Sequence, residues 1–197
     1  MSDFVIGITG ASGSIYGIRL IHELSLKNHH INVIITSAGR IVIQEELGGL
    51  GNREIKKIFI KKDNVKIWDE IDFNAPFISG SNAPDAVIVI PCSMGSLSSI
   101  ANGISGNVLE RAADVVLKER KQLILVIRET PLSLIHIENM LKAAKAGAII
   151  LPAMPAFYNH PKTLDDMVNF VVGKVLSILS IEHKLIKRWG KNNVNTK

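Results

Sequence analysis

Short apolar runs that alternate with amphipathic segments are the feature that most restricts how this chain can fold. Each run is five or six residues long and rich in Val and Ile, and a segment with helical spacing of its apolar residues follows it. Strands that are apolar throughout are typical of parallel sheets covered by helices on both faces. The clearest runs are Phe4–Thr9, Ile31–Ile35, Ala86–Ile90 and Leu123–Ile127. The pattern predicts an α/β protein, a three-layer αβα sandwich with a mostly parallel sheet.

Weaker patterns complete the expected order of elements. The expected helices are 15–27, 38–47, 97–101, 108–118 and 164–181, and the further strands are 65–68 and 148–151. Thr130 followed by Pro131 is typical of a helix start, so a helix is expected from there to about Ala146. The stretch 48–85 is less regular, with a helix expected around 53–59. No linker or repeat divides the chain, which favours a single domain over 1–197 with a basic tail at about 184–197.

Composition excludes several classes of protein. With 47% hydrophobic and 21% charged residues, the chain is not expected to be disordered. No apolar run approaches the ~18–20 residues that cross a bilayer, and no basic residue precedes Arg19 as a signal peptide would require. A single cysteine, Cys92, can form neither an internal disulfide nor a thiolate zinc cage. The expected location is the cytosol.

The net charge of +5 raises the question of a polyanionic partner. Part of the excess lies in the basic tail and in a lysine cluster, which comprises Lys56, Lys57, Lys61, Lys62 and Lys66. Neither stretch interleaves aromatic residues for base stacking. A solvated face and a basic tail are the favoured interpretation, and no nucleic-acid partner is expected.

Small, hydroxyl-rich loops follow three of the predicted strands. They are Gly10–Ser14, Thr36-Ser37 and Ser93–Ser96, each at the start of a predicted helix. Because ligands of open parallel sheets bind beyond the carboxyl ends of the strands, the N–H and hydroxyl groups of these loops could bind one anion together. The alternative for any single loop is helix capping by its Ser or Thr. Three such loops on one edge favour a phosphorylated ligand.

The spacing of the glycines narrows the class of ligand. Gly10, Gly13 and Gly17 give GxxGxxxG, which is neither the dinucleotide GxGxxG nor a P-loop. Thr36 and Ser37 stand where an adenosine ribose would need an acidic residue. NAD and ATP are therefore disfavoured, and a mononucleotide such as FMN fits better.

Other polar residues offer weaker indications. Arg128 and Glu129 directly follow a buried strand, which makes them candidate site residues. The alternative is that they form a structural ion pair. Tyr158 and Lys174 lie near the C-terminus, where a packing aromatic and a solvated lysine are the alternatives. Cys92 has no nearby histidine to activate it, and neither HExxH nor GxSxG occurs, so metal and triad hydrolase chemistry are unsupported.

The order of several motifs resembles a known family. They are Gly10-Ala-Ser-Gly13, Tyr16-Gly17, Ser79-Gly-Ser81, Pro91-Cys-Ser93, Glu110–Arg120, Arg128-Glu-Thr-Pro131 and Pro155-Ala-Phe-Tyr158. From about Phe4 to Gly190 the chain resembles the UbiX flavin prenyltransferases, formerly described as phenylacrylic acid or 3-octaprenyl-4-hydroxybenzoate decarboxylases. The resemblance implies a Rossmann-like or flavodoxin-like flavoprotein, commonly a dodecamer with its active site at a subunit interface. Its members join the dimethylallyl group of dimethylallyl phosphate to N5 and C6 of reduced FMN, without a metal, and the product serves UbiD-type decarboxylases.

The resemblance also implies roles for individual residues. FMN would be bound by Gly10, Ala11, Ser12, Ser37, Ser93, Met94, Gly95, Ser96 and Arg128. Dimethylallyl phosphate would be bound by Tyr158, Lys174, Arg111 and Lys118, and the catalytic residues would be Glu129, Ser12 and Lys118. Many relatives carry Arg at the position of Lys174, and a lysine keeps the charge but loses the two-pronged contact with phosphate. The family's acidic residue after the second helix corresponds to Glu46 or to its neighbour Glu45.

Two rival functions belong to other classes. One is a related FMN-dependent flavoprotein that oxidatively decarboxylates a cysteine-containing substrate; such relatives have a histidine after the first loop, where this chain reads Ile15-Tyr-Gly-Ile. The other is a non-catalytic flavin- or RNA-binding module, which would leave Arg128, Glu129, Lys118 and Tyr158 without a purpose.

Overall fold

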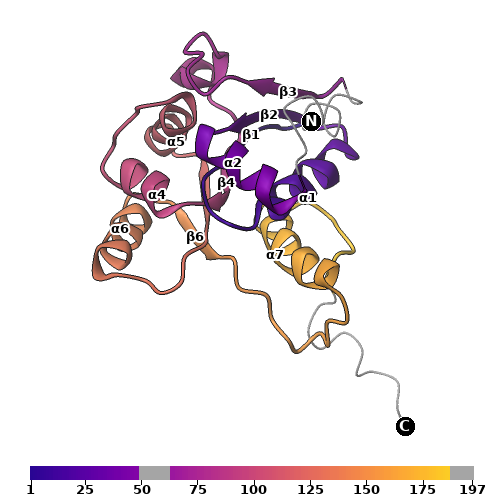
Figure 1. Ribbon diagram of the computed structural model, residues 1–197. Coiled ribbons are helices and arrows are strands. Elements are labelled where there is room, and N and C mark those ends of the chain that lie inside the picture. The colour runs from indigo at the N-terminus through magenta and orange to yellow at the C-terminus, as the bar shows by residue number, and fades with distance from the viewer. Residues whose placement is uncertain (49–62, 187–197) are drawn as a thin grey trace. The chain divides into compact units, whose positions relative to one another are not determined.

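A parallel sheet organises the part of the chain that the computed structural model describes, residues 1–48 and 63–186. The strands run in the order β3-β2-β1-β4-β5-β6, and every neighbouring pair is parallel (Figure 1). They are β1 (Asp3–Ile8), β2 (His30–Ile35), β3 (Val65–Trp68), β4 (Ala86–Cys92), β5 (Gln122–Ile127) and β6 (Ile149–Pro152). The strand order reverses between β1 and β4, so the loops after these strands flank the crevice where such sheets bind ligands. The predicted α/β fold class is confirmed.

Helices connect the strands. They are α1 (Ser14–Ser25), α2 (Ser37–Glu46), α4 (Met94–Ala101), α5 (Val108–Lys118), α6 (Leu134–Lys145) and α7 (Leu164–Ile178). Two short 3₁₀ turns, η1 (Pro76–Ile78) and η2 (Gly80–Asn82), lie between β3 and β4. Residues 1–153 form one compact unit that holds the sheet with α1, α2, α4, α5 and α6, and a second unit begins at Met154 and holds α7. The expectation of one domain over 1–197 stays a prediction.

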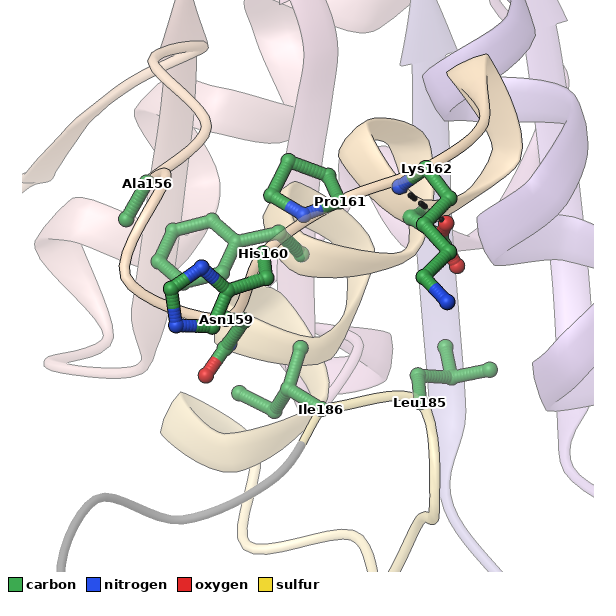
Figure 2. Close-up of a pocket in the computed structure, with 9 residues that line it drawn as sticks. Ala156, Asn159, His160, Pro161, Lys162, Leu185 and Ile186 are labelled. Atoms are coloured by element: carbon green, nitrogen blue, oxygen red, sulfur yellow. Dashed lines mark hydrogen bonds between the residues drawn. The ribbon is translucent and has the colours of Figure 1, made fainter.

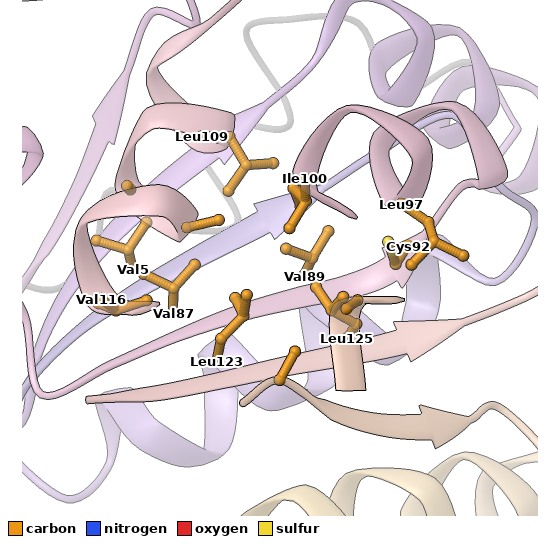
Figure 3. Close-up of a cluster of buried hydrophobic side chains, with 14 of the residues drawn as sticks. Val5, Val87, Val89, Cys92, Leu97, Ile100, Leu109, Val116, Leu123 and Leu125 are labelled. Carbon is orange, nitrogen blue, oxygen red and sulfur yellow. The ribbon is translucent and has the colours of Figure 1, made fainter. Parts of the chain in front are cut away.

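The core of the first unit follows from the alternation of side chains along the strands. Val5, Val87 and Leu123 are fully buried on the face covered by α4 and α5, where they join a cluster with Leu97 and Leu109 (Figure 3). Strand residues of the opposite parity, such as Ile8 and Ile90, are equally buried and face the side of α1. Burial on both faces explains why the strands are apolar throughout.

Gly17 allows α1 to approach the sheet closely. A Cβ at this position would lie 2.4 Å from the carbonyl oxygen of Ile90 and 2.8 Å from the side chain of Ile8. Any larger residue would push α1 away from β1 and β4. The third glycine of the GxxGxxxG pattern therefore positions the helix that begins at the first loop.

Several elements have other bounds than the sequence-based expectations: α4 begins three residues earlier than expected, α7 ends three residues earlier, and two further differences have a local cause. β4 continues through Pro91 and Cys92, because Pro91 lies where the register with β5 shifts and a proline interrupts no regular ladder there. The helix expected at Thr130-Pro131 begins instead at Leu134. Ser133 is its N-cap, and the Ser133 hydroxyl and the His136 ring each accept a hydrogen bond from the other residue's backbone N–H. The expected start at Thr130 was therefore wrong.

Some expectations fall on residues that the structure does not describe. The helix around 53–59, Lys56, Lys57, Lys61, Lys62 and the tail beyond Ile186 all lie outside the described residues. Within 1–48 and 63–186, none of the helices has the length and apolar character needed to cross a bilayer.

Candidate functional site

Thr9 joins the loops that follow β1 and β4. Its fully buried hydroxyl donates a hydrogen bond to the carbonyl oxygen of Pro91 at 2.8 Å and accepts one from the N–H of Ser93 at 2.8 Å. The first and third predicted loops are thus held side by side at the switch in strand order. Sequence reasoning took Thr9 only as the end of an apolar run, and its one signal was a hydroxyl at the carboxyl end of a strand.

The first and second loops also touch. A Cβ on Gly10 would lie 2.6 Å from the Cβ of Ala38, so only a glycine lets the first loop pack against the start of α2. The N–H of Thr36 donates to the carbonyl oxygen of Ile8 at 3.1 Å, which ties the end of β2 to the end of β1. The three hydroxyl-rich loops therefore form one continuous edge, as the strand pattern predicted.

Glu46 supplies the cap that α1 lacks. The N-cap residue of α1 is Gly13, which has no side chain to accept from the helix. From the last residue of α2, the Glu46 carboxylate accepts from the N–H of Gly13 at 2.7 Å and from the N–H and hydroxyl of Ser14 at 2.9 and 2.6 Å. Of the two candidate acidic residues, Glu46 is therefore the one that binds the first loop. Partial burial raises the pKa of Glu46, but hydrogen bonds from Ser12, Ser14 and Gly13 together lower it below its ordinary value.

Arg128 brings a positive charge to the same edge. Its backbone N–H donates to the carbonyl oxygen of Cys92 at 3.2 Å, which places it beside the third loop. Both charges affect the pKa of Tyr16, on the first turn of α1. Its phenol has a raised pKa, mainly because of burial; the charge of Arg128 lowers this pKa and that of Glu46 raises it. Tyr16 is therefore close enough for both charges to act on its phenol, although sequence reasoning gave it no role.

Glu129 does not neutralise Arg128. Its carboxylate accepts from the N–H of Thr130 at 3.0 Å, and within residues 1–48 and 63–186 no ion pair joins it to Arg128. The Arg128 side chain is exposed and Glu129 is partly exposed. The structural ion pair considered from the sequence is not formed, so both charges remain available to a ligand.

Helix capping accounts for two of the hydroxyls. Thr36 caps α2 by accepting from the N–H of Gly39 at 3.1 Å, and Ser93 caps α4 by accepting from the N–H of Ser96 at 3.3 Å. The capping alternative is therefore right for these two hydroxyls. Ser37 lies one residue inside α2 and binds the carboxylate of Glu70, which sequence reasoning did not single out.

Lys118 and Arg111 lie at opposite ends of α5, and Lys118 is away from the hydroxyl-rich loops. Lys118 ends α5 shortly before β5 begins, at the edge where the strands start, and it pairs with Glu119. Its ammonium also lies only 2.5 Å from the position that a Cβ on Gly80 would take, so Lys118 adjoins the Ser79-Gly-Ser81 motif. Arg111, in the first turn of α5, pairs with Asp114 at 2.6 Å. Within one copy of the chain, Lys118 therefore lies at the opposite end of the strands from the hydroxyl-rich loops.

In the second unit, Tyr158 and Lys174 meet on one aromatic ring. The Tyr158 ring stands edge-on to Phe170 with centroids 6.0 Å apart, and the Lys174 ammonium lies 5.6 Å from the centre of the same ring. Phe170 and Lys174 are four residues apart on α7, so they share one face of the helix. The structure thus brings together the two residues expected to bind the prenyl donor, and Phe170 is the link that the sequence did not reveal.

A cavity of about 260 Å³ lies within the second unit, and Phe170 is one of its lining residues (Figure 2). His160, Lys162, Leu185 and Ile186 are among its lining residues. None of the residues expected to bind FMN or dimethylallyl phosphate lines it.

Cys92 is part of the core of the first unit. Burial raises the pKa of the Cys92 thiol to about 12, and the side chain is fully buried, as the interpretation of a small core residue predicted. Among the described residues, no group of three or more His, Cys, Asp or Glu side chains gathers as metal ligands would.

A parallel sheet whose switch-point edge presents backbone N–H groups, hydroxyls and an exposed arginine defines a mononucleotide-binding protein. The chain matches the Flavoprotein family over residues 2–187, so it is a flavoprotein by family.

Closer relatives specify the family further. The chain is 51% identical to the flavin prenyltransferase UbiX of Halalkalibacterium halodurans, across 98% of this chain and 95% of the relative. It is 48% identical to that of Methanocaldococcus jannaschii, across 94% and 97% of the two chains. The protein belongs to the UbiX family of flavin prenyltransferases, which are transferases.

Solved structures agree with this assignment. AnUbiX (PadA1), solved with FMN and dimethylallyl pyrophosphate, superposes with a TM-score of 0.88 at 35% identity and covers 95% of this chain and 97% of its own. A dodecameric FMN-dependent UbiX-like decarboxylase from Escherichia coli O157:H7 gives 0.86 at 39% identity, with 95% and 98% covered. The peptidyl-cysteine decarboxylase EpiD gives 0.57 at 18% identity, with 88% and 98% covered, and so shares the fold alone.

Proposed function

We propose that this chain joins the dimethylallyl group of dimethylallyl phosphate to N5 and C6 of reduced FMN and releases the prenylated flavin. The observation that carries the proposal is the edge where Thr9 and Gly10 hold three loops in contact, with the exposed Arg128 beside them. The level of identity to UbiX relatives supports the same chemistry.

The residues present fit FMN. The flavin supplies an electron-rich, nucleophilic ring once it is reduced. Backbone N–H groups at Gly10 and Ser37 would bind its phosphate, because helix starts favour anions. Ala11 would lie beside the phosphate, since its own N–H already donates to the carbonyl oxygen of Thr9 at 2.9 Å. Ser93 to Ser96 would line the opposite wall, where a Cβ on Gly95 would meet no atom nearer than 3.9 Å. Arg128 would contribute a cation that no carboxylate in the described part of the chain neutralises by an ion pair.

The prenyl donor needs a different set of groups. When its allylic C–O bond breaks, the electron pair stays with the departing phosphate, which gains negative charge. A phenol and an ammonium can stabilise that charge. Tyr158 and Lys174 already lie against the same ring of Phe170, so one phosphate could contact both. Glu129 would transfer a proton, with Ser12, which hydrogen-bonds to Glu46, as a second catalytic residue.

The complete site would be shared between copies of this chain. α6 buries only Ala143 and exposes Leu134 by 69%, Ile135 by 67% and Leu141 by 55%. An apolar helix face of this kind is typical of a subunit interface. It starts six residues after Arg128, and a relative at 39% identity is dodecameric. Lys118 and Arg111 would then serve as phosphate contacts, and Lys118 would do so in the site of a second copy.

Less direct parts of the proposal follow from the same reaction. The recipient of the product would be a UbiD-type decarboxylase, and the reaction would run in the cytosol. The reaction would need no metal, because side chains would stabilise the negative charge on the leaving phosphate.

The decisive experiment is to mix the purified protein with reduced FMN and dimethylallyl phosphate, and then to determine the mass of the flavin. We expect a product heavier by one five-carbon unit. A parallel reaction with dimethylallyl pyrophosphate measures which donor is preferred. Unchanged flavin with either donor would refute the proposal. A peptide ending in cysteine, incubated with oxidised FMN, tests the cysteine decarboxylase alternative, and loss of CO₂ from it would favour that function.

The shared site has its own test. Ile135→Glu places a charge in the apolar face of α6 and should shift the protein to smaller species in light scattering, with loss of prenyl transfer. Leu26→Glu is the matched control, because Leu26 is 59% exposed but lies at the end of α1. An Ile135→Glu protein that keeps the parental mass would show that α6 is not the interface.

A further inference from the structure

Glu70 binds the start of α2 with a carboxylate. One carboxylate oxygen of Glu70 accepts from the N–H of Ser37 at 2.8 Å, and it also accepts a short hydrogen bond from the Ser37 hydroxyl. Ser37 is the first residue of α2, where free N–H groups carry the positive end of the helix dipole. The chain therefore fills the anion-binding end of this helix with a charge of its own.

The same two donors are the ones that the proposed function gives to FMN. An N–H group and a hydroxyl each have one proton to donate, so neither can bind Glu70 and a phosphate at full strength together. Two anions at hydrogen-bonding distance from one donor would also repel each other. Glu46 presents no such conflict at backbone groups, because it binds the N–H groups of Gly13 and Ser14 rather than that of Gly10.

The Glu70 side chain can leave Ser37 while its backbone stays in place. The carbonyl oxygen of Glu70 accepts from the N–H of Val108 at 2.8 Å, which ties it to the start of α5. The turn around it is closed by the N–H of Asp72, which donates to the carbonyl oxygen of Asp69 at 3.2 Å. Rotation about the side-chain bonds of Glu70 would therefore free Ser37 without moving β3 or α5.

We propose that the Glu70 carboxylate competes with the flavin phosphate for the two donors of Ser37. When FMN binds, its phosphate displaces the Glu70 carboxylate from Ser37. The inference rests on the proposed function, because it needs FMN at this edge. Glu70 is then a positioning residue for the start of α2. Its carboxylate accepts the hydrogen bonds of Ser37 when no flavin is bound, and this competition weakens the binding of FMN. A carboxylate that merely supported α2 would have the opposite effect, since its neutralisation would loosen Ser37 and weaken FMN binding.

The test compares affinities for FMN and riboflavin in Glu70→Gln. Riboflavin has the same ring and ribityl chain but no phosphate. Competition predicts that Glu70→Gln binds oxidised FMN about tenfold more tightly than the parent, or ~1.4 kcal/mol, and binds riboflavin equally well. Quenching of flavin fluorescence gives both affinities. Asp69→Asn is the matched control: it removes a neighbouring charge but retains the side-chain oxygen that accepts from the N–H of Ile71 at 3.2 Å.

The possible outcomes separate the inference from the function beneath it. If the parent binds FMN and Glu70→Gln binds it equally or more weakly, the competition is refuted while the proposed function stands. If Asp69→Asn tightens FMN binding as much as Glu70→Gln, the effect is one of net charge, and the competition is also refuted. If neither parent nor variant binds FMN, the proposed function fails first.

Discussion

Thr9→Val tests whether the buried hydroxyl between β1 and β4 holds the site edge together. Valine has nearly the same shape, so the change removes the two hydrogen bonds of the hydroxyl without opening a cavity. The carbonyl oxygen of Pro91 keeps a second donor, the N–H of Thr9 at 3.3 Å, whereas the N–H of Ser93 loses its acceptor. One unsatisfied buried donor costs about 1–3 kcal/mol and the lost hydrogen bond adds about 1 kcal/mol.

We therefore expect the free energy of unfolding to fall by about 2–4 kcal/mol in Thr9→Val. For a chain of this length that corresponds to a decrease in Tm of roughly 4–16 °C. Thr9→Ser is the matched control: it keeps the hydroxyl and loses one methyl group, at about 1 kcal/mol. Unfolding by urea should be followed at a fixed protein concentration, since association would change the apparent stability. If Thr9→Val is as stable as Thr9→Ser, the hydrogen bonds of Thr9 do not hold the edge.

Further predictions concern the chemistry and the cap of α1. Glu129→Gln should keep FMN bound and slow prenyl transfer by ~10²–10⁴-fold, as measured by product mass over time. Tyr158→Phe should lower kcat/KM for dimethylallyl phosphate by about 10- to 150-fold, since one hydrogen bond to a charged group is lost. Lys174→Ala should act in the same direction, Lys174→Arg should retain or improve activity, and FMN affinity should barely change in all three. Glu46→Gln should lower stability at neutral pH, and in urea unfolding at several pH values the deficit should shrink as pH falls.

The sign of the last effect follows from the lowered pKa of Glu46. Its stabilising contribution is complete above its unfolded value of 4.5 and is lost as pH falls through the lower folded value, where the parent also becomes neutral. A deficit that stays constant from neutral to acid pH would contradict this reasoning.

The other variants have contradicting outcomes of their own. If Glu129→Gln turns over at the parental rate, Glu129 is only a structural residue. Weaker FMN binding with intact donor use in Lys174→Ala would show that the role given to α7 is wrong.

Local patterns sufficed for much of the fold. β3 and α5 have the bounds that the sequence predicted, because apolar periodicity and a following break define both. The start of α6 was missed because Thr130-Pro131 resembles a helix start. The actual capping box pairs Ser133 with His136 instead of the usual Glu or Gln.

The site shows where sequence reasoning ends. The hydroxyl-rich loops could be found because every strand end of a parallel sheet is a candidate. Glu46 and Glu70 bind residues 32 and 33 positions away, and no local pattern predicts which carboxylate reaches which loop. The contact of Tyr158 and Lys174 through Phe170 similarly depends on how a loop returns to α7.

The burial of Cys92 gives this protein a natural reporter of its own opening. It is the chain's only cysteine, and it lies in β4, directly before Ser93. Only the thiolate attacks disulfide reagents, and burial with a pKa of about 12 withholds it while the fold is intact. The rate at which such a reagent labels the unmodified protein therefore counts how often the centre of the sheet opens. A ligand that binds beside Ser93 should lower this labelling rate, with no engineered probe required.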